Sequence, residues 1–242
     1  MLEKYRETDL YPPIQKFFTE LDYRVNAEVK GCDVAMTKDG ELLIIELKKS
    51  FNLTLLYQAM DRQRITSQVY VAIPRPKRAK GTDYANMLTI ARKLSLGLIT
   101  VALDSPVQTV EVLVFPPAAA LKPPRKPNRR EAVLKEMDGR SADYNLGGST
   151  RRKLMTAYRE KALKIACMLE HLGTSTAKRL VRLGCDKGAN GIMRANHYGW
   201  FERVEKGVYG LTQTGKDALS DGAFAALVQF YRAESAVLLQ EE

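Results

Sequence analysis

Three side chains in the first fifty residues have types and spacing that could support metal-assisted hydrolysis. Asp39-Gly40 is typical of a two-residue hairpin turn in which both residues have positive φ. If this dipeptide is the turn, counting outward places Asp33 directly opposite Glu46, with Cβ atoms about 5 Å apart. Lys48 then points to the same face, roughly 7 Å away. The pattern predicts two carboxylates and one ammonium group on one side of a β-hairpin.

This set of groups suits the hydrolysis of a phosphodiester. Mg²⁺ binds through one or two carboxylates together with water and phosphate oxygens. The metal polarises the phosphoryl oxygen and ionises water, and a nearby cation stabilises the charge that develops. We therefore predict that Asp33 and Glu46 bind Mg²⁺ or Mn²⁺ and that Lys48 stabilises charge.

A surface ion pair is the alternative explanation, and such pairs contribute little. The face that carries the three charged groups, however, also carries Ala35, Leu42 and Ile44. Charges in a strand that is apolar on both faces are costly unless they are paired or have a function. This favours the metal site. The opposite face is predicted to be core and consists of Val34, Met36, Leu43, Ile45 and Leu47.

The apolar periodicity of residues 1–115 predicts the order helix, three strands, helix, strand, and then helix and two strands. Strands that are apolar on both faces indicate an α/β fold whose sheet is covered by helices on both sides. The predicted helices span residues 11–21, 53–65 and 83–96, and the predicted strands are 23–29, the two hairpin strands, 69–74, 97–103 and 109–115.

The 242-residue composition is that of a globular protein with one large domain or two ordinary ones. No apolar run approaches the roughly 18 residues that a membrane span needs. The N-terminal residues lack the apolar segment of a signal peptide, so we expect a cytoplasmic protein. The cysteines have no CxxC spacing and are expected to be reduced core thiols: Cys32, Cys167 and Cys185.

Charge and composition divide the chain into three predicted parts. Of the net charge of +10, residues 1–115 carry +2, residues 116–150 carry +3 and residues 151–242 carry +5, which favours a polyanionic partner such as nucleic acid. Residues 116–150 are rich in proline, glycine and charge and are predicted to be a linker. In the last part, three short helices are followed by a hairpin. This is the winged-helix arrangement, a variant of the helix-turn-helix.

The third of these helices, predicted over residues 186–198, carries the candidates for nucleic-acid contact. Basic and amide side chains suit contacts with phosphates and with the major groove. Winged helices also dock proteins, so a protein-interaction module is the alternative. The candidates are Lys187, Asn190, Arg194, Asn196 and His197, with Lys206 on the wing.

The chain resembles the PD-(D/E)XK nuclease superfamily, whose hallmark is an acid on one strand and (D/E)-x-K on the next within an α-β-β-β-α-β core. Asp33, Glu46 and Lys48 occupy these positions. The segments ETDLYPP, GCDVA, IELK, NLGGSTRRK and GVYGLT are also similar to an uncharacterised bacterial family described as PD-(D/E)XK-type phosphodiesterases. The resemblance implies a restriction-endonuclease-like core and a Mg²⁺- or Mn²⁺-dependent nuclease.

The chain departs from the superfamily pattern at two places. Cys32 precedes Asp33 where many members have proline, and Gln58 is followed at i+4 by Arg62 where some members have tyrosine. These two residues share one helical face, so Gln58 could orient water or substrate and Arg62 could contact phosphate; a solvated helix face is the alternative. The candidates for the extra acid that some members place near the metal are Glu7, Asp9 and Glu28.

Together these observations predict a metal-dependent nuclease that acts on nucleic acid, with DNA favoured over RNA. We expect no membrane partner, and a homodimer would suit cleavage of both strands of a duplex. Two alternatives use the same fold as a scaffold: a non-catalytic DNA-binding regulator and a protein-docking module. The intact set of Asp33, Glu46 and Lys48 speaks against the non-catalytic regulator.

Overall fold

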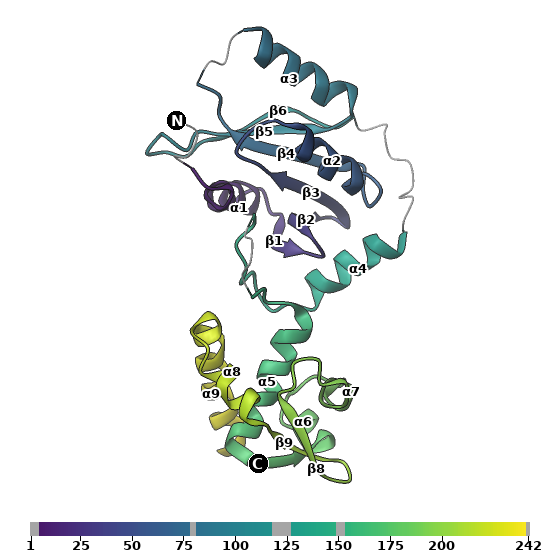
Figure 1. The fold of residues 1–242 in the computed structure, drawn as a ribbon, viewed down its shortest axis with the longest axis vertical. Helices are drawn as coiled ribbons and strands as arrows, with labels where there is room; N and C mark the ends of the chain where they lie inside the picture. Colours follow the sequence, from purple (N-terminus) through teal and green to yellow (C-terminus); the bar gives the residue numbers. More distant parts are fainter. Residues whose placement is uncertain (1–4, 78–80, 118–126, 149–152, 241–242) are drawn as a thin grey trace. The chain divides into compact units, whose positions relative to one another are not determined.

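The structure is a computed structural model that describes residues 5–77, 81–117, 127–148 and 153–240. It divides into two compact units, Met1–Leu154 and Met155–Glu242, which are described separately (Figure 1). Each unit has its own buried apolar core.

The first unit is built on a six-stranded mixed sheet with the strands in chain order (Figure 1). Neighbouring strands are antiparallel except for β3–β4 and β4–β5, which are parallel. This mixed α/β architecture is compatible with a nuclease-like core. The strands are β1 (Arg24–Val29), β2 (Cys32–Lys38), β3 (Glu41–Leu47), β4 (Gln68–Pro74), β5 (Gly97–Val101) and β6 (Val110–Val114).

The predicted hairpin register is confirmed. β2 and β3 pair from Lys38↔Glu41 to Val34↔Ile45, and the turn residues Asp39 and Gly40 have φ values of 52° and 78°. These values are those of a type I′ turn, which joins two strands across two residues and which Asn-Gly or Asp-Gly favours. The core face is also as predicted, since its five apolar side chains are all buried.

Helices cover both faces of the sheet. The 3₁₀ helix η1 (Glu7–Leu10) and α1 (Tyr11–Thr19) pack on the face of Val34 and Ile45. On the other face, α2 (Leu53–Arg62) and α3 (Thr82–Lys93) bury apolar side chains against β4 and β5. Pro12 and Pro13 suit the first turn of α1, where no intrahelical donor is lost. Asn52 caps α2 by accepting a hydrogen bond from the amide of Leu55.

The structure differs from the sequence expectation at residues 116–150. Residues Pro127–Asp138 form α4, and Val133 and Met137 are almost fully buried against Cys32, Ala35 and Ile44. The buried guanidinium of Arg140 donates to the carbonyls of Ala27, at 2.7 Å, and Glu28, at 2.8 Å. The described part of this segment therefore belongs to the first unit. The composition suggests a linker because it reports local propensity and not these distant partners.

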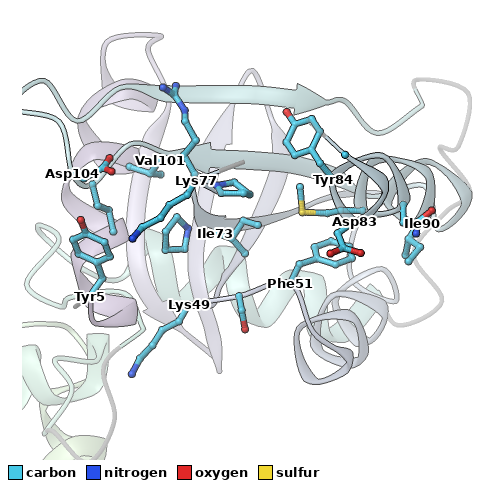
Figure 2. Close-up of a pocket in the computed structure, with 18 of the residues that line it drawn as sticks. Tyr5, Lys49, Phe51, Ile73, Lys77, Asp83, Tyr84, Ile90, Val101 and Asp104 are labelled. Atoms are coloured by element: carbon cyan, nitrogen blue, oxygen red, sulfur yellow. The ribbon is translucent and has the colours of Figure 1, made fainter. Parts of the chain in front are cut away.

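A cavity of about 1470 Å³ opens beyond the carboxyl ends of β3, β4 and β5 (Figure 2). Its walls come from Tyr5, the segment after β3, the end of β4 and the segment after it, α3, and the end of β5 and the segment after it. Ligand sites of α/β sheets lie at this edge because loops, and not helices, close the sheet there.

The second unit contains a three-stranded sheet in the order β7-β9-β8 and helices packed on one core. Its second helix begins at Ala177, because Thr176 caps it and residues 174–176 pair with β9. The elements are α5 (Ala157–Leu172), β7 (Thr174–Thr176), α6 (Ala177–Arg182), α7 (Ala189–Ala195), β8 (Phe201–Glu205), β9 (Val208–Leu211), α8 (Gln213–Leu219), η3 (Gly222–Phe224) and α9 (Ala225–Gln240).

All three cysteines are buried free thiols, as the sequence predicts. Within the described parts of the chain, no helix combines the length and the apolar character needed to cross a bilayer.

Candidate active site

Asp33, Glu46 and Lys48 lie where β2 and β3 end, and they interact electrostatically with one another. Regular pairing of the two strands stops at Val34↔Ile45. One residue further, the Asp33 carboxylate takes the place of a ladder partner, because its Oδ2 accepts a hydrogen bond from the amide of Leu47 at 2.9 Å. Asp33 is thereby held against the end of β3.

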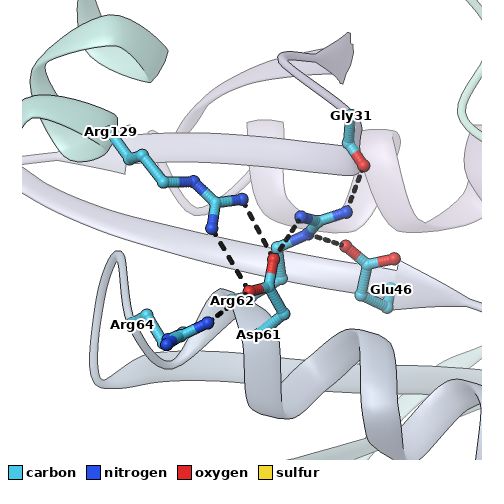
Figure 3. Close-up of polar contacts among 6 residues, drawn as sticks. All are labelled: Gly31, Glu46, Asp61, Arg62, Arg64 and Arg129. Atoms are coloured by element: carbon cyan, nitrogen blue, oxygen red, sulfur yellow. Dashed lines mark hydrogen bonds and ion pairs between the residues drawn. The ribbon is translucent and has the colours of Figure 1, made fainter. Parts of the chain in front are cut away.

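Glu46 is fully buried, on the same face of β3 as Leu42 and Ile44, and Arg62 reaches it from α2. Its Oε1 accepts a hydrogen bond from Arg62 Nε at 2.6 Å (Figure 3). Its Oε2 is also buried but has no hydrogen-bond partner in the described structure. A buried carboxylate oxygen without a donor is costly, so this atom marks a place where a further group would be stabilising.

A small network fixes the Arg62 guanidinium (Figure 3). It donates to the carbonyl of Gly31 and to Asp61, and Asp61 in turn receives two hydrogen bonds from Arg129 of α4, at 3.0 and 3.2 Å. The sequence predicts that Arg62 contacts nucleic acid. In the structure its side chain is only 12 % exposed, and its contacts are with groups of the protein.

Burial dominates the electrostatics of the two carboxylates. Desolvation, reinforced by the nearby Asp33, raises the pKa of Glu46 to about 8, although Arg62 acts in the opposite direction. Desolvation also raises the pKa of Asp33. Burial acts to lower the pKa of Arg62, but Glu46, Cys32 and Asp61 together outweigh it and hold that pKa above its ordinary value. Without a bound cation, the site formed by Asp33 and Glu46 therefore carries less negative charge than two ionised carboxylates would give it.

Lys48 points to a carboxylate of η1. Its Nζ lies 2.9 Å from Glu7 Oε2, and both side chains are largely covered. Among the three candidates for the extra acid, Glu7 is therefore the one that the structure brings to this cluster. Asp9 Oδ2 instead accepts from the amide of Arg6, and Glu28 lies on β1 with a positive φ of 53°.

Gln58 lies on α2 one turn before Arg62, on the helix that covers Glu46. Its Oε1 is buried and, like Glu46 Oε2, has no hydrogen-bond partner in the described structure. An amide oxygen in this position can accept from a water molecule or bind a hard cation.

The glycine pair Gly147-Gly148 packs behind the site. A Cβ at Gly147 would lie 2.9 Å from the carbonyl oxygen of Asp33, and one at Gly148 would lie 3.2 Å from the Glu7 Cβ. Nearby, Asp143 accepts from the amide of Ala27 at 2.9 Å. The composition of residues 116–150 predicts a linker here. The Gly-Gly dipeptide, which is typical of close backbone approach, is the signal that could indicate packing of this segment against the site.

The donor set fits a hard divalent cation. Asp33 and Glu46 supply carboxylate oxygens, and Gln58 supplies an amide oxygen. One carboxylate oxygen, Glu46 Oε2, is buried and has no hydrogen-bond partner in the part of the chain that the structure describes. No cluster of three or more His, Cys, Asp or Glu side chains that could hold a metal ion occurs within residues 5–77, 81–117, 127–148 and 153–240. Mg²⁺ needs only one or two carboxylates because water and phosphate oxygens complete its coordination.

In the second unit, most of the predicted nucleic-acid contacts are exposed side chains around α7 and the β8–β9 turn: Lys187, Asn190, Arg194, His197 and Lys206. Asn196 is different. It ends α7 with φ 44°, and its amide donates to the Phe201 carbonyl at 2.7 Å and accepts from the Phe201 amide at 3.1 Å. Its side chain therefore joins α7 to β8.

Residues 99–218 match the model of a family described as "Putative PD-(D/E)XK phosphodiesterase (DUF2161)". The expected resemblance to the PD-(D/E)XK phosphodiesterases is confirmed. The matched segment runs from β5 to α8, so the family resemblance extends into the second unit. It begins after Lys48, and the assignment of Asp33, Glu46 and Lys48 therefore rests on the geometry described above. Searches of the curated proteins and of the solved structures found no match to the chain.

Proposed function

We propose that this protein is a metal-dependent phosphodiesterase that cleaves nucleic acid, and DNA in the first instance. The observation that carries the proposal is the buried Glu46 Oε2, which has no hydrogen-bond partner among the described residues and lies beside Asp33 and Lys48 at the end of β3. The mixed six-stranded sheet and the match to PD-(D/E)XK phosphodiesterases support it.

Each residue of the cluster has a proposed role. Asp33 and Glu46 hold Mg²⁺ or Mn²⁺, which when bound polarises the phosphoryl oxygen and supplies ionised water. Lys48, kept in place by Glu7, stabilises the charge that develops on the phosphate. Gln58 orients water or substrate. Arg62 holds the Glu46 carboxylate in a fixed orientation.

The second unit is proposed to be a winged-helix domain that binds the nucleic acid. Its element order of helix, strand, two helices and hairpin supports this assignment. Lys187, Asn190 and Arg194 on and before α7, together with His197 and the wing residue Lys206, contribute the contacts. Asn196 contributes through the placement of α7 against β8.

Isothermal titration with Mn²⁺ in low-phosphate buffer, with and without a DNA duplex, tests the metal site. We expect binding by the wild type and its loss in Asp33→Asn, and unchanged binding in the matched control Asp39→Asn, whose side chain lies in the exposed hairpin turn. In cleavage assays, Glu46→Gln and Lys48→Ala should lower the rate at least about a hundredfold, whereas Glu41→Gln on the same strand should not. Absence of Mn²⁺ binding in both titrations would overturn the proposal.

One observation favours a second candidate, a non-catalytic DNA-binding protein. The 2.6 Å ion pair between Arg62 and Glu46 already neutralises the principal metal ligand. If this pair is permanent, DNA binding should occur without any cleavage in Mn²⁺ and should be unaffected by Asp33→Asn.

A further inference from the structure

The cavity beyond β3, β4 and β5 adjoins the proposed metal site. The amide of Lys48 donates to the carbonyl of Ala72 at 3.0 Å, so these two residues are neighbours across β3 and β4. The next residue of each segment, Lys49 and Ile73, lines the cavity. A ligand in the cavity would therefore lie next to the residue that is proposed to contact the scissile phosphate.

The cavity has aromatic walls from three separate parts of the chain. Tyr5, Phe51 and Tyr84 all line it, and Figure 2 shows them spread around its perimeter. Proline and other apolar side chains, including the buried Ile73 and Met87, also line it. Flat apolar rings in a concave site suit a flat ligand that can stack, and every nucleobase offers such a π-face.

The charged groups at the cavity suit the rest of a nucleotide. Lys49 and Lys77 are exposed and have no ion-pair partner among the described residues, whereas Arg75 is paired with Glu111 at 3.2 Å. The two lysines are therefore available to phosphates. Asp83 and Asp104 also line the cavity, and carboxylates accept hydrogen bonds from the ring N–H and amino groups of bases.

We infer that this cavity binds unpaired nucleotides of the substrate strand beside the scissile phosphate. A base inside a duplex cannot reach it, because both of its faces are stacked and removing it from the stack costs a few kcal/mol. A strand end, flap or single-stranded region offers free bases without that cost. The inference rests on the proposed function and extends it: the preferred substrate is a single-stranded or tailed nucleic acid, and a continuous duplex is disfavoured.

Binding of a short fluorescein-labelled oligothymidylate in EDTA, followed by fluorescence anisotropy, tests the cavity without any catalysis. We expect Phe51→Leu, which keeps apolar volume but removes the ring, to weaken binding about tenfold. Lys77 is exposed, and Lys77→Ala should lower the magnitude of the slope of log affinity against log salt concentration by about 0.7. The matched controls are Tyr57→Leu, an exposed aromatic residue outside the cavity, and Lys16→Ala on α1; neither should change the affinity.

The readouts separate this inference from the proposed function. Binding that is unchanged in Phe51→Leu and Lys77→Ala, or no binding of the oligothymidylate at low salt, overturns the cavity as a nucleotide site even if a blunt duplex is cleaved in Mn²⁺. Binding that both variants weaken supports the site even if no substrate is cleaved. If cleavage also occurs, a tailed duplex should be cut faster than the blunt one, and Phe51→Leu should abolish that preference.

Discussion

At the scale of single residues, Glu46 is the position on which the chemistry depends. A fully buried carboxylate is stable only with partners. Within the described parts of the chain, Glu46 has one guanidinium on Oε1 and no hydrogen-bond partner on Oε2. Arg62 prevents the side chain from turning, and the second oxygen is left for another group. The same arrangement explains the raised pKa, because one ion pair does not replace the lost hydration.

The first prediction concerns the pH dependence of stability in EDTA. A carboxyl group whose pKa is raised in the folded state stabilises the fold below its ordinary pKa near 4.5, and this stabilisation is lost as the pH rises through about 8. Glu46→Gln keeps an oxygen for Arg62 but does not titrate. We expect its melting temperature to exceed that of the wild type by a margin that grows between pH 5 and 9, reaching roughly 3 °C or more.

The control for this prediction is Glu41→Gln, an exposed change on the same strand, whose melting temperature should follow the wild type at every pH. Saturating Mn²⁺ should reverse the order at pH 8, because only the wild type gains a ligand. Parallel profiles for the wild type and Glu46→Gln in EDTA would show that the buried carboxylate does not titrate in this range.

At the scale of elements, what the sequence predicts depends on how local the cause is. The register of β2 and β3 follows from one dipeptide and from alternating apolar residues, and both are local. The faces of Glu46 and Lys48 follow from that register. The ion pairs of the same residues do not: Arg62 and Glu7 reach the site from α2 and η1, and nothing in the local pattern indicates which cation meets which carboxylate.

Helix α4 shows the opposite case. The segment that contains it, residues 116–150, is rich in proline, glycine and charge and suggests a linker. Yet α4 and Arg140, which follows it, are held by partners more than sixty residues away: Asp61 for Arg129, and the β1 carbonyls for Arg140. The local sequence does not indicate strand β7 either, because its three residues form a strand only through pairing with β9. In both places tertiary contacts outweigh local propensity.

The second prediction tests the docking of α4. Met137→Ala removes a side chain that is 1 % exposed among Cys32, Ala35 and Val133, and it should lower the free energy of unfolding by about 2–5 kcal/mol. Urea denaturation followed by circular dichroism measures this change. Lys135→Ala, on the exposed side of the same helix, is the control and should be nearly neutral. If Met137→Ala were also neutral, α4 would not be part of the folded core.

The third prediction concerns α7. Arg194→Ala should weaken binding of a DNA duplex and lower the magnitude of the salt slope by about one, as expected for the loss of one phosphate contact. Lys216→Ala on α8, also exposed and basic, is the matched control. Asn196→Ala should act differently: it breaks two hydrogen bonds to Phe201 and should reduce stability by about 1–3 kcal/mol. Equal effects of Arg194→Ala and Lys216→Ala on binding would point to nonspecific charge alone.

At the scale of the whole molecule, the chain combines two units with separate cores and separate proposed tasks. The candidate active site and the cavity lie within the first unit, and the basic α7 face within the second. The second half of the chain also carries most of the excess positive charge. If the first unit carries out catalysis and the second binds the nucleic acid, a ligand of one unit should leave the stability of the other unchanged.

The fourth prediction uses the single tryptophan of the chain. Trp200 is 6 % exposed in the core of the second unit, so its fluorescence reports the unfolding of that unit, whereas circular dichroism reports both. Mn²⁺ at a hundred times its dissociation constant should stabilise the first unit by about 2.7 kcal/mol. We therefore expect Mn²⁺ to shift the circular-dichroism transition to higher urea while the Trp200 midpoint stays in place.

The Asp33→Asn variant is the control, because its circular-dichroism transition should not respond to Mn²⁺ at all. An equal shift of both signals in the wild type would mean that the two units unfold together. Metal bound near Glu46 would then raise the urea midpoint reported by Trp200. A shift of the Trp200 signal alone would place the metal in the second unit and would contradict the site built from Asp33 and Glu46. The fluorescence of Trp200 thus distinguishes the unfolding of the second unit from that of the first in the intact chain.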